Sequence, residues 1–209
     1  MHIPDGFLTP NTWVSAWVVS IGALSFCIKR AYKTLKDRAV PLMGITAAFI
    51  FAAQMLNFPV LGGTSGHLLG GVLAAVLLGP FAGAVVISVV LIVQCLIFQD
   101  GGLTALGANM FNMSFVGVLT GYYFYRLVSS FIKSDKGIII GTAIASWLSV
   151  VLASSFCAFE LALSGTSPLK IALPAMVFVH MFIGIGEALI TCLVVAFILK
   201  TRPDLIYNK

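Results

Sequence analysis

Charged residues are scarce in this chain. Asp, Glu, Lys and Arg make up 9% of its 209 residues, whereas an ordinary soluble domain carries about 25%. Hydrophobic residues account for 60%, and the mean hydropathy is +1.08. So little charge cannot cover a water-exposed surface, and membranes are crossed mainly by helices whose backbone groups bond internally. We therefore expect an all-α membrane protein with a single transmembrane domain over residues 1–209.

Catalytic and nucleotide-binding motifs are lacking as well. No G-x-x-x-x-G-K-[ST] phosphate-binding loop occurs, so ATP chemistry is not expected in this chain. No HExxH motif or comparable pair of metal ligand and base occurs, which argues against an intramembrane protease. Basic residues do not interleave with aromatic ones as in nucleic-acid-binding folds, and nucleic acid is not an expected partner. We predict that the protein is not an enzyme.

The cysteines offer no metal or disulfide framework. None stands in a CxxC pair, and all four lie in apolar stretches: Cys27, Cys95, Cys157 and Cys192. We interpret them as small buried hydrophobic side chains. The first ten residues also lack the positive region of a signal peptide, so we expect Met1 to stay as the amino terminus.

Seven apolar segments are candidate transmembrane helices. They run over residues 12–28, 41–56, 61–78, 80–98, 108–127, 137–163 and 169–199. Only Gly79-Pro80 divides the third from the fourth, so these two could be one kinked helix. The positions of the basic residues decide between one kinked helix and two separate ones, because Lys and Arg concentrate in cytoplasmic loops.

Seven spans with an outer N-terminus place all basic residues except Lys170 on the inner side. These residues are Lys29, Arg30, Lys33, Lys36, Arg38, Arg126, Lys133, Lys136, Lys200, Arg202 and Lys209. Fusing the third and fourth segments would divide the basic residues evenly. We therefore predict seven transmembrane helices, an outer N-terminus, a cytoplasmic C-terminus and a multi-pass location in the plasma (inner) membrane.

The first two residues form a potential chelator. The Met1 amine, the His2 amide and Nδ1 of the His2 ring can bind one ion through a five-membered and a six-membered ring, leaving a fourth planar position open. A Pro4-Asp5-Gly6 turn among apolar residues predicts that this tail folds back into the mouth of the helix bundle. Amine ligation predicts that metal affinity falls as the pH drops below about 7.7–8.0, the usual pKa of an α-amine.

His67 is the candidate for the fourth position. It directly follows the glycine-rich segment Gly62–Gly66 and, in the predicted topology, lies on the same side as His2. Asn57 or Asn109 could orient its second ring nitrogen. His180 and Glu187, seven residues apart on one face of the last span, are a possible proton or metal relay or a structural pair.

Four planar nitrogens, one of them an ionised amide, suit nickel(II) or copper(II). Zinc prefers tetrahedral geometry, and magnesium and calcium prefer oxygen ligands. The methionines form no array typical of a copper(I) carrier. Nickel is our first choice of metal, with cobalt next.

Four motifs are similar to those of the NikM/CbiM family. They are Met-His-Ile-Pro-Asp-Gly-Phe-Leu at the start, residues 54–60 (QMLNFPV), residues 62–70 (GGTSGHLLG) and residues 98–103 (FQDGGL). Members of this family are the substrate-binding membrane (S) components of energy-coupling-factor (ECF) transporters for nickel and cobalt. The resemblance implies a seven-helix bundle with an inserted tail, and a metal held by Met1, His2 and His67.

The resemblance also implies partners. They are a transmembrane coupling subunit, two cytoplasmic ATPase subunits and a small membrane protein of the NikN/CbiN type. The lipid bilayer is a further expected partner of this chain. The expected function is high-affinity capture of nickel(II) from outside. Two alternatives stay open: cobalt(II) uptake for cobalamin synthesis by the same architecture, and a self-contained secondary metal transporter.

Overall fold

The computed structural model describes residues 1–34 and 39–208 and is mostly helical. Its helices are α1 (Pro10–Thr34), α2 (Ala39–Gln54), α3 (Gly71–Leu78), α4 (Pro80–Phe98), α5 (Leu106–Met110), the π-helix η1 (Phe111–Thr120), α6 (Gly121–Phe131), α7 (Asp135–Leu163), α8 (Leu169–Thr201) and the 3-10 turn η2 (Pro203–Leu205). Helices α5, η1 and α6 follow one another without a break. The described residues thus form seven main helical units, consistent with the predicted all-α fold.

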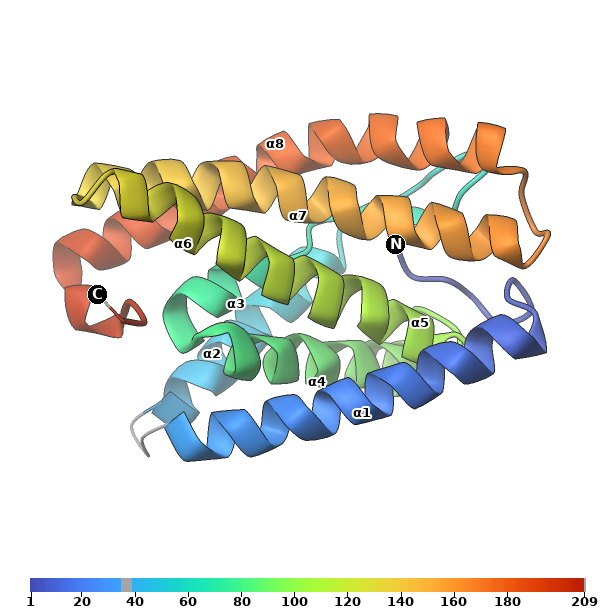
Figure 1. The fold of residues 1–209 in the computed structure, drawn as a ribbon, viewed down its shortest axis with the longest axis horizontal. Helices are drawn as coiled ribbons and strands as arrows, with labels where there is room; N and C mark the ends of the chain where they lie inside the picture. Colours follow the sequence, from blue (N-terminus) through green and yellow to red (C-terminus); the bar gives the residue numbers. More distant parts are fainter. Residues whose placement is uncertain (35–38, 209) are drawn as a thin grey trace.

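Chain connections gather at the two ends of the bundle (Figure 1). The N-terminal tail, the loop after α4 and the loop between α7 and α8 lie at one end. The connection of α6 to α7 and the C-terminus lie at the other. Within the described residues, α1, α4, α7 and α8 are long and apolar enough to cross a membrane, and α2 is a shorter apolar helix. This is the architecture of a multi-pass membrane protein.

The third predicted span is only partly helical. Helix α3 has 8 residues and is about 12 Å long, too short for a hydrocarbon core of about 30 Å. Residues 61–70 instead form the end of a hairpin and a loop, with positive φ angles at Gly62 and Gly70. Strands β1 (Asn57–Pro59) and β2 (Ser65–His67) pair antiparallel, with Asn57 opposite His67. Apolar composition predicted the burial of this segment but not its extended backbone.

The chain reverses direction between α3 and α4. Gly83 packs so closely on α3 that an added Cβ would lie 3.0 Å from the backbone nitrogen of Ala75. In one continuous helix these two residues would stand about 12 Å apart. The reading of the third and fourth segments as one kinked helix is therefore excluded.

The hairpin and the loop after it run alongside α8. Three glycines approach α8 so closely that a Cβ on each would touch a side chain of that helix: Gly62 at Ile171, Gly63 at Met176 and Gly66 at Ile183. Strand β1 is exposed, whereas Gly66 and His67 on β2 are buried, so non-helical backbone at this point is tolerated because it lies against protein. It carries His67 into the interior of the bundle.

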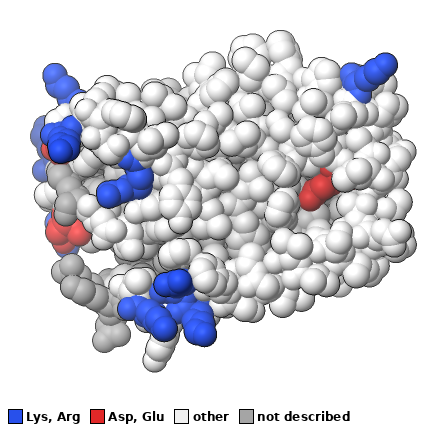
Figure 2. All heavy atoms as spheres, in the orientation of Figure 1, with Lys and Arg blue, Asp and Glu red and all other residues white. Residues whose placement is uncertain are grey.

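Figure 2 shows that Lys and Arg side chains gather at the end of the bundle that holds the C-terminus. A broad surface without Lys or Arg separates them from basic atoms at the other end, and acidic atoms are also visible toward that end. Lys36, Arg38 and Lys209, which the sequence also assigns to the basic side, lie outside the described residues.

The backbone nitrogen of Tyr207 donates to the carbonyl of Val76 at 2.9 Å, which fixes the C-terminal segment against α3.

Candidate metal centre

The N-terminal tail is inserted into the bundle, as the sequence predicts. Met1 and Ile3 are completely buried, and His2 is 4% exposed. Asn109 holds the backbone of Ile3 from both sides: its Oδ1 accepts from Ile3 N at 2.8 Å, and its Nδ2 donates to Ile3 O at 3.1 Å. Gly102 N also donates to Ile3 O, at 2.9 Å. These bonds fix the depth at which Met1 and His2 lie.

The turn after the tail is anchored to the loop between α4 and α5. Asp5 accepts hydrogen bonds from the Thr104 amide at 2.8 Å and the Leu103 amide at 3.1 Å. The Thr104 hydroxyl and these amides lower the pKa of Asp5 below its usual value. Farther along, the Thr166 hydroxyl donates to the Phe7 carbonyl. The tail is thus attached to two different loops at this end of the bundle.

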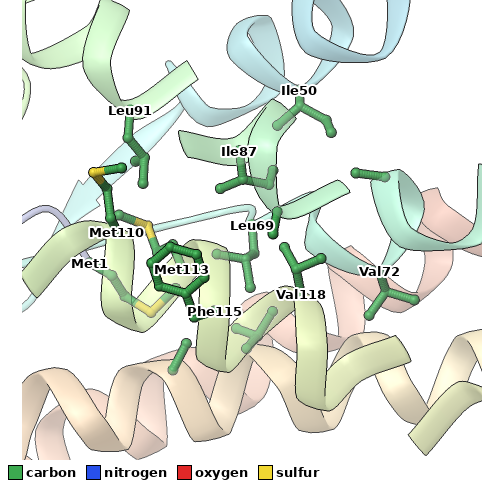
Figure 3. Close-up of a cluster of buried hydrophobic side chains, with 14 of the residues drawn as sticks. Met1, Ile50, Leu69, Val72, Ile87, Leu91, Met110, Met113, Phe115 and Val118 are labelled. Carbon is green, nitrogen blue, oxygen red and sulfur yellow. The ribbon is translucent and has the colours of Figure 1, made fainter. Parts of the chain in front are cut away.

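Met1 contributes both its side chain and its amine. The side chain lies in the buried apolar cluster that includes Met113 and Phe115 (Figure 3). The amine donates to the Ser65 carbonyl and, at 2.9 Å, to the Ser65 hydroxyl. Burial lowers the pKa of this amine from about 8 to about 5. At neutral pH the amine is therefore uncharged and has a lone pair that can bind a metal.

The rings of His2 and His67 stack on each other. Their centroids are 4.4 Å apart and their planes differ by 13°. Nδ1 of His2 lies 3.1 Å from Oδ1 of Asp100, and burial is the main cause of the lowered pKa of His2. Among the described residues, Nε2 of His67 has no hydrogen-bond partner. A buried ring nitrogen without a partner next to a neutral amine is well suited to a metal.

Hydrogen bonding sets the orientation of His67. Its Nδ1 lies 2.6 Å from the Leu68 carbonyl oxygen. Since a carbonyl can only accept, Nδ1 carries the proton and Nε2 keeps a free lone pair. This arrangement, with one ring nitrogen bonded to a carbonyl and the other bare, is the usual one for histidines that bind metals.

Among the described residues, neither predicted orienting residue, Asn57 or Asn109, is hydrogen-bonded to the His67 ring. Asn109 clamps Ile3, and Nδ2 of Asn57 lies 3.3 Å from Oδ2 of Asp100. The Leu68 carbonyl takes the role that we had expected of these amides, because the ring folds back onto its own main chain. The amides instead position the His2 side of the site.

Sequence reasoning missed Ser65. Its hydroxyl accepts from the Met1 amine at 2.9 Å and from the His2 amide at 3.1 Å, so two of the predicted ligand nitrogens converge on one atom. The only signal was its place two residues before His67. The rings of His2 and His67 do not yet converge, because lone pairs lie in ring planes and nearly parallel stacked rings cannot both point at one ion. Binding by both rings requires one of them to turn.

His180 and Glu187 are buried but do not form a pair with each other. Nδ1 of His180 lies 2.7 Å from the Met176 carbonyl, within its own helix. The Glu187 carboxylate accepts from the backbone nitrogens of Leu69 and Gly70. Within the described part of the chain, no group of three or more His, Cys, Asp or Glu side chains forms a metal cluster.

Related proteins are nickel and cobalt transporters. A fused nickel transport protein NikMN assigned in Archaeoglobus fulgidus is 45% identical over 211 residues, covering 100% of this chain and 69% of that protein. The fused nickel transport protein NikMN of Rhodobacter capsulatus is 34% identical, covering 99% of this chain and 64% of that protein. A cobalt transport protein CbiM assigned in Methanocaldococcus jannaschii is 32% identical, with coverage of 99% and 90%.

A solved structure and a family model agree with these relatives. The crystal structure of a transition metal transporter superposes with a TM-score of 0.91 at 37% identity, covering 96% of this chain and 93% of that one. The family model CbiM, described as the cobalt uptake substrate-specific transmembrane region, matches residues 2–205. The chain therefore belongs to the CbiM family of nickel and cobalt transport proteins, whose members are components of metal transporters rather than enzymes.

Proposed function

We propose that this chain captures nickel(II) with high affinity from outside the cell. The ligands are the Met1 amine, the His2 amide and Nδ1, and Nε2 of His67. The single observation that carries this proposal is the burial of the Met1 amine beside Nε2 of His67, a buried ring nitrogen without a hydrogen-bond partner among the described residues. Leaving such a ring nitrogen buried and unpaired is costly unless a ligand uses it.

Asp100 and Ser65 hold the ligands in the metal-free state. When the ion binds, a bond to the metal replaces the contact between Nδ1 of His2 and Asp100. Bonds to the metal likewise replace the hydrogen bonds from the Met1 amine and the His2 amide to the Ser65 hydroxyl. The stacked rings separate at the same step, since Nε2 of His67 has to enter the plane of the chelate. The amide ionises as the metal binds, and its proton leaves to solvent.

Nickel and cobalt relatives support the choice of metal equally well. We place nickel first because an ionised amide and three further nitrogens favour a planar d⁸ ion. Cobalt(II) is the alternative substrate of the same site. An absorption spectrum separates the two cases: a yellow, diamagnetic nickel complex is expected for planar ligation by four nitrogens.

We also propose the orientation and the partners. The end rich in Lys and Arg faces the cytoplasm, because basic loops stay on that side. The tail then opens to the outside, which is the geometry of uptake. This chain lacks a phosphate-binding loop, so a coupling subunit and two ATPase subunits of ECF type drive transport, together with a small NikN/CbiN-type protein.

An added N-terminal segment tests the proposal. Extending the chain by a few residues before Met1 converts the amine into an amide and should abolish tight nickel binding, measured by titration calorimetry. The melting temperature of the metal-free protein shows whether the fold persists. Retained tight binding in a folded, extended protein would remove Met1 from the site. Proton-driven nickel accumulation in liposomes that contain this chain alone would favour a secondary transporter instead.

A further inference from the structure

The peptide group that joins Leu68 to Leu69 is hydrogen-bonded on both sides. Its carbonyl oxygen accepts from Nδ1 of His67 at 2.6 Å. Its N–H donates to Oε2 of Glu187 at 2.7 Å. A carboxylate on α8 is therefore connected to the ring of a candidate metal ligand through one rigid, planar peptide unit.

Glu187 accepts hydrogen bonds from two backbone N–H groups of this loop. Its other oxygen, Oε1, accepts from Gly70 N at 2.7 Å, so both oxygens are engaged. The side chain is 2% exposed. An ionised carboxylate only accepts hydrogen bonds, and bonds to a charged acceptor are short and strong. Two backbone donors at this distance identify Glu187 as the acceptor that fixes residues 69 and 70.

Two further contacts fix this loop in place. Nε2 of Gln54 donates to the Leu69 carbonyl at 2.7 Å. Gly70 has a φ of +73° and packs on Ile50, where an added Cβ would lie 2.7 Å from that side chain. The peptide cannot tilt freely, so its carbonyl keeps one direction relative to the His67 ring.

We propose that Glu187 is the positioning residue of the metal site. Acting through the Leu68–Leu69 peptide, it keeps the proton of His67 on Nδ1 and aims the unprotonated Nε2 at the ion. A carboxylate at the N–H side polarises the peptide, which makes its carbonyl a better acceptor for the ring. The inference rests on the proposed function, because it concerns the ligand His67.

The competing explanation is that Glu187 serves only to satisfy buried backbone groups. In that case its loss would lower stability and leave the affinity of the folded protein unchanged. Positioning predicts a loss of affinity that depends on the presence of His67. The two explanations differ in a quantity that can be measured on folded protein.

The test replaces Glu187 by Gln in the full chain, purified in detergent and titrated with nickel(II). The amide keeps the size of the side chain but loses the charge and one acceptor. We expect binding to weaken by about 10–100-fold, as for other groups that orient a metal ligand. Glu160→Gln is the matched control, since Glu160 is also buried and bonds Asn112 at 2.6 Å rather than the His67 loop. Its affinity should stay at the wild-type value.

A double-mutant cycle supplies the decisive outcome. In a His67→Ala background, Glu187→Gln should cause no further loss of affinity, because interacting groups are not additive. Full additivity, or wild-type affinity in folded Glu187→Gln, would overturn the positioning role. A wild-type protein that binds neither nickel nor cobalt would refute the proposed function itself.

A measurement on the unmutated chain covers the case in which Glu187→Gln does not fold. Nitrogen NMR of protein labelled in its three histidines reports which ring nitrogen carries the proton, and the His67 signals are assigned by their loss in His67→Gln. We expect His67 to be protonated at Nδ1 and bare at Nε2. A proton on Nε2 in the metal-free protein would also overturn the proposal.

Discussion

At the scale of single residues, burial changes the chemistry of the chain terminus. The Met1 amine is in contact with Ser65 and is closed off from solvent, so its pKa is about 5 instead of about 8. The sequence alone suggested that protons would compete with metal from about pH 8 downward. In the structure, competition between protons and metal for the Met1 amine begins about three pH units lower.

The expected pH dependence of binding follows from this shift. The amine is already uncharged at about pH 7.5, so only the His2 amide releases a proton there. The logarithm of the nickel affinity should fall by about one for each pH unit between about pH 8 and pH 6, and more steeply near pH 5. Calorimetry in buffers of different ionisation enthalpy should give about one proton released per ion at pH 7.5.

Two other proton counts would contradict parts of this ligand set. Release of two protons would mean that the amine is charged in the metal-free protein. No release would exclude the ionised amide.

The lowered pKa of the Met1 amine also affects folding. As the pH falls from about 8 to about 5, the amine takes up a proton in the unfolded chain but stays uncharged in the folded one, so the stability of the metal-free protein should decrease.

At the scale of elements, the inserted tail is held by burial of its apolar side chains and by a set of backbone hydrogen bonds. Asn109 on α5 supplies two of its bonds, both to Ile3. Gly102 supplies another, and a Cβ there would collide with the backbone of Pro4 and Asp5. The depth of the chelator therefore depends on residues about a hundred positions away in the sequence.

Asn109→Ala should release the tail without unfolding the bundle. Losing the partner of a buried backbone donor costs about 1–3 kcal/mol, so we expect metal affinity to fall by about tenfold or more. The terminal amine should also react faster with an acylating reagent, measured by mass spectrometry of the N-terminal peptide. Asn11→Ala, at an exposed position on α1, is the control. Wild-type affinity and protection in Asn109→Ala would show that the tail does not depend on this clamp.

At the scale of the whole molecule, most of the positive charge and the candidate site lie at opposite ends. The described basic residues other than Lys170 gather at the end that carries the C-terminus, away from the tail. Glu187 on α8 contacts the loop that carries His67, and the same helix continues to the basic end at Lys200. Displacement of α8 at its basic end would thus reach the site directly.

Two exposed lysines provide a matched test of orientation. Lys170→Cys stands at the tail end and Lys136→Cys at the basic end. An impermeant maleimide should label Lys170→Cys in intact cells and Lys136→Cys only after permeabilisation. The native cysteines among the described residues are buried or half-buried, which keeps the background low. The reverse pattern would place the tail in the cytoplasm and exclude capture from outside.

The prediction of the fold succeeded where hydropathy and length decide. Long apolar runs with few charges predict helices such as α4 and α8, because a membrane leaves no other way to satisfy their backbone. The prediction failed at residues 61–70, which are apolar enough for a helix but glycine-rich. Contacts with α8, Gln54 and Glu187 replace the helical hydrogen bonds there, and hydropathy does not report such contacts.

The sequence by itself determined the candidate ligands. A histidine at position 2, a second one in a glycine-rich segment and few other metal-binding side chains are sufficient to name Met1, His2 and His67. Only the tertiary structure decided their environment: the neutral amine, the stacked rings, Ser65 between the main-chain nitrogens and the peptide link from Glu187 to His67. Ligand identity is a matter of residue type, whereas pKa, tautomer and ring direction depend on groups that only folding brings together.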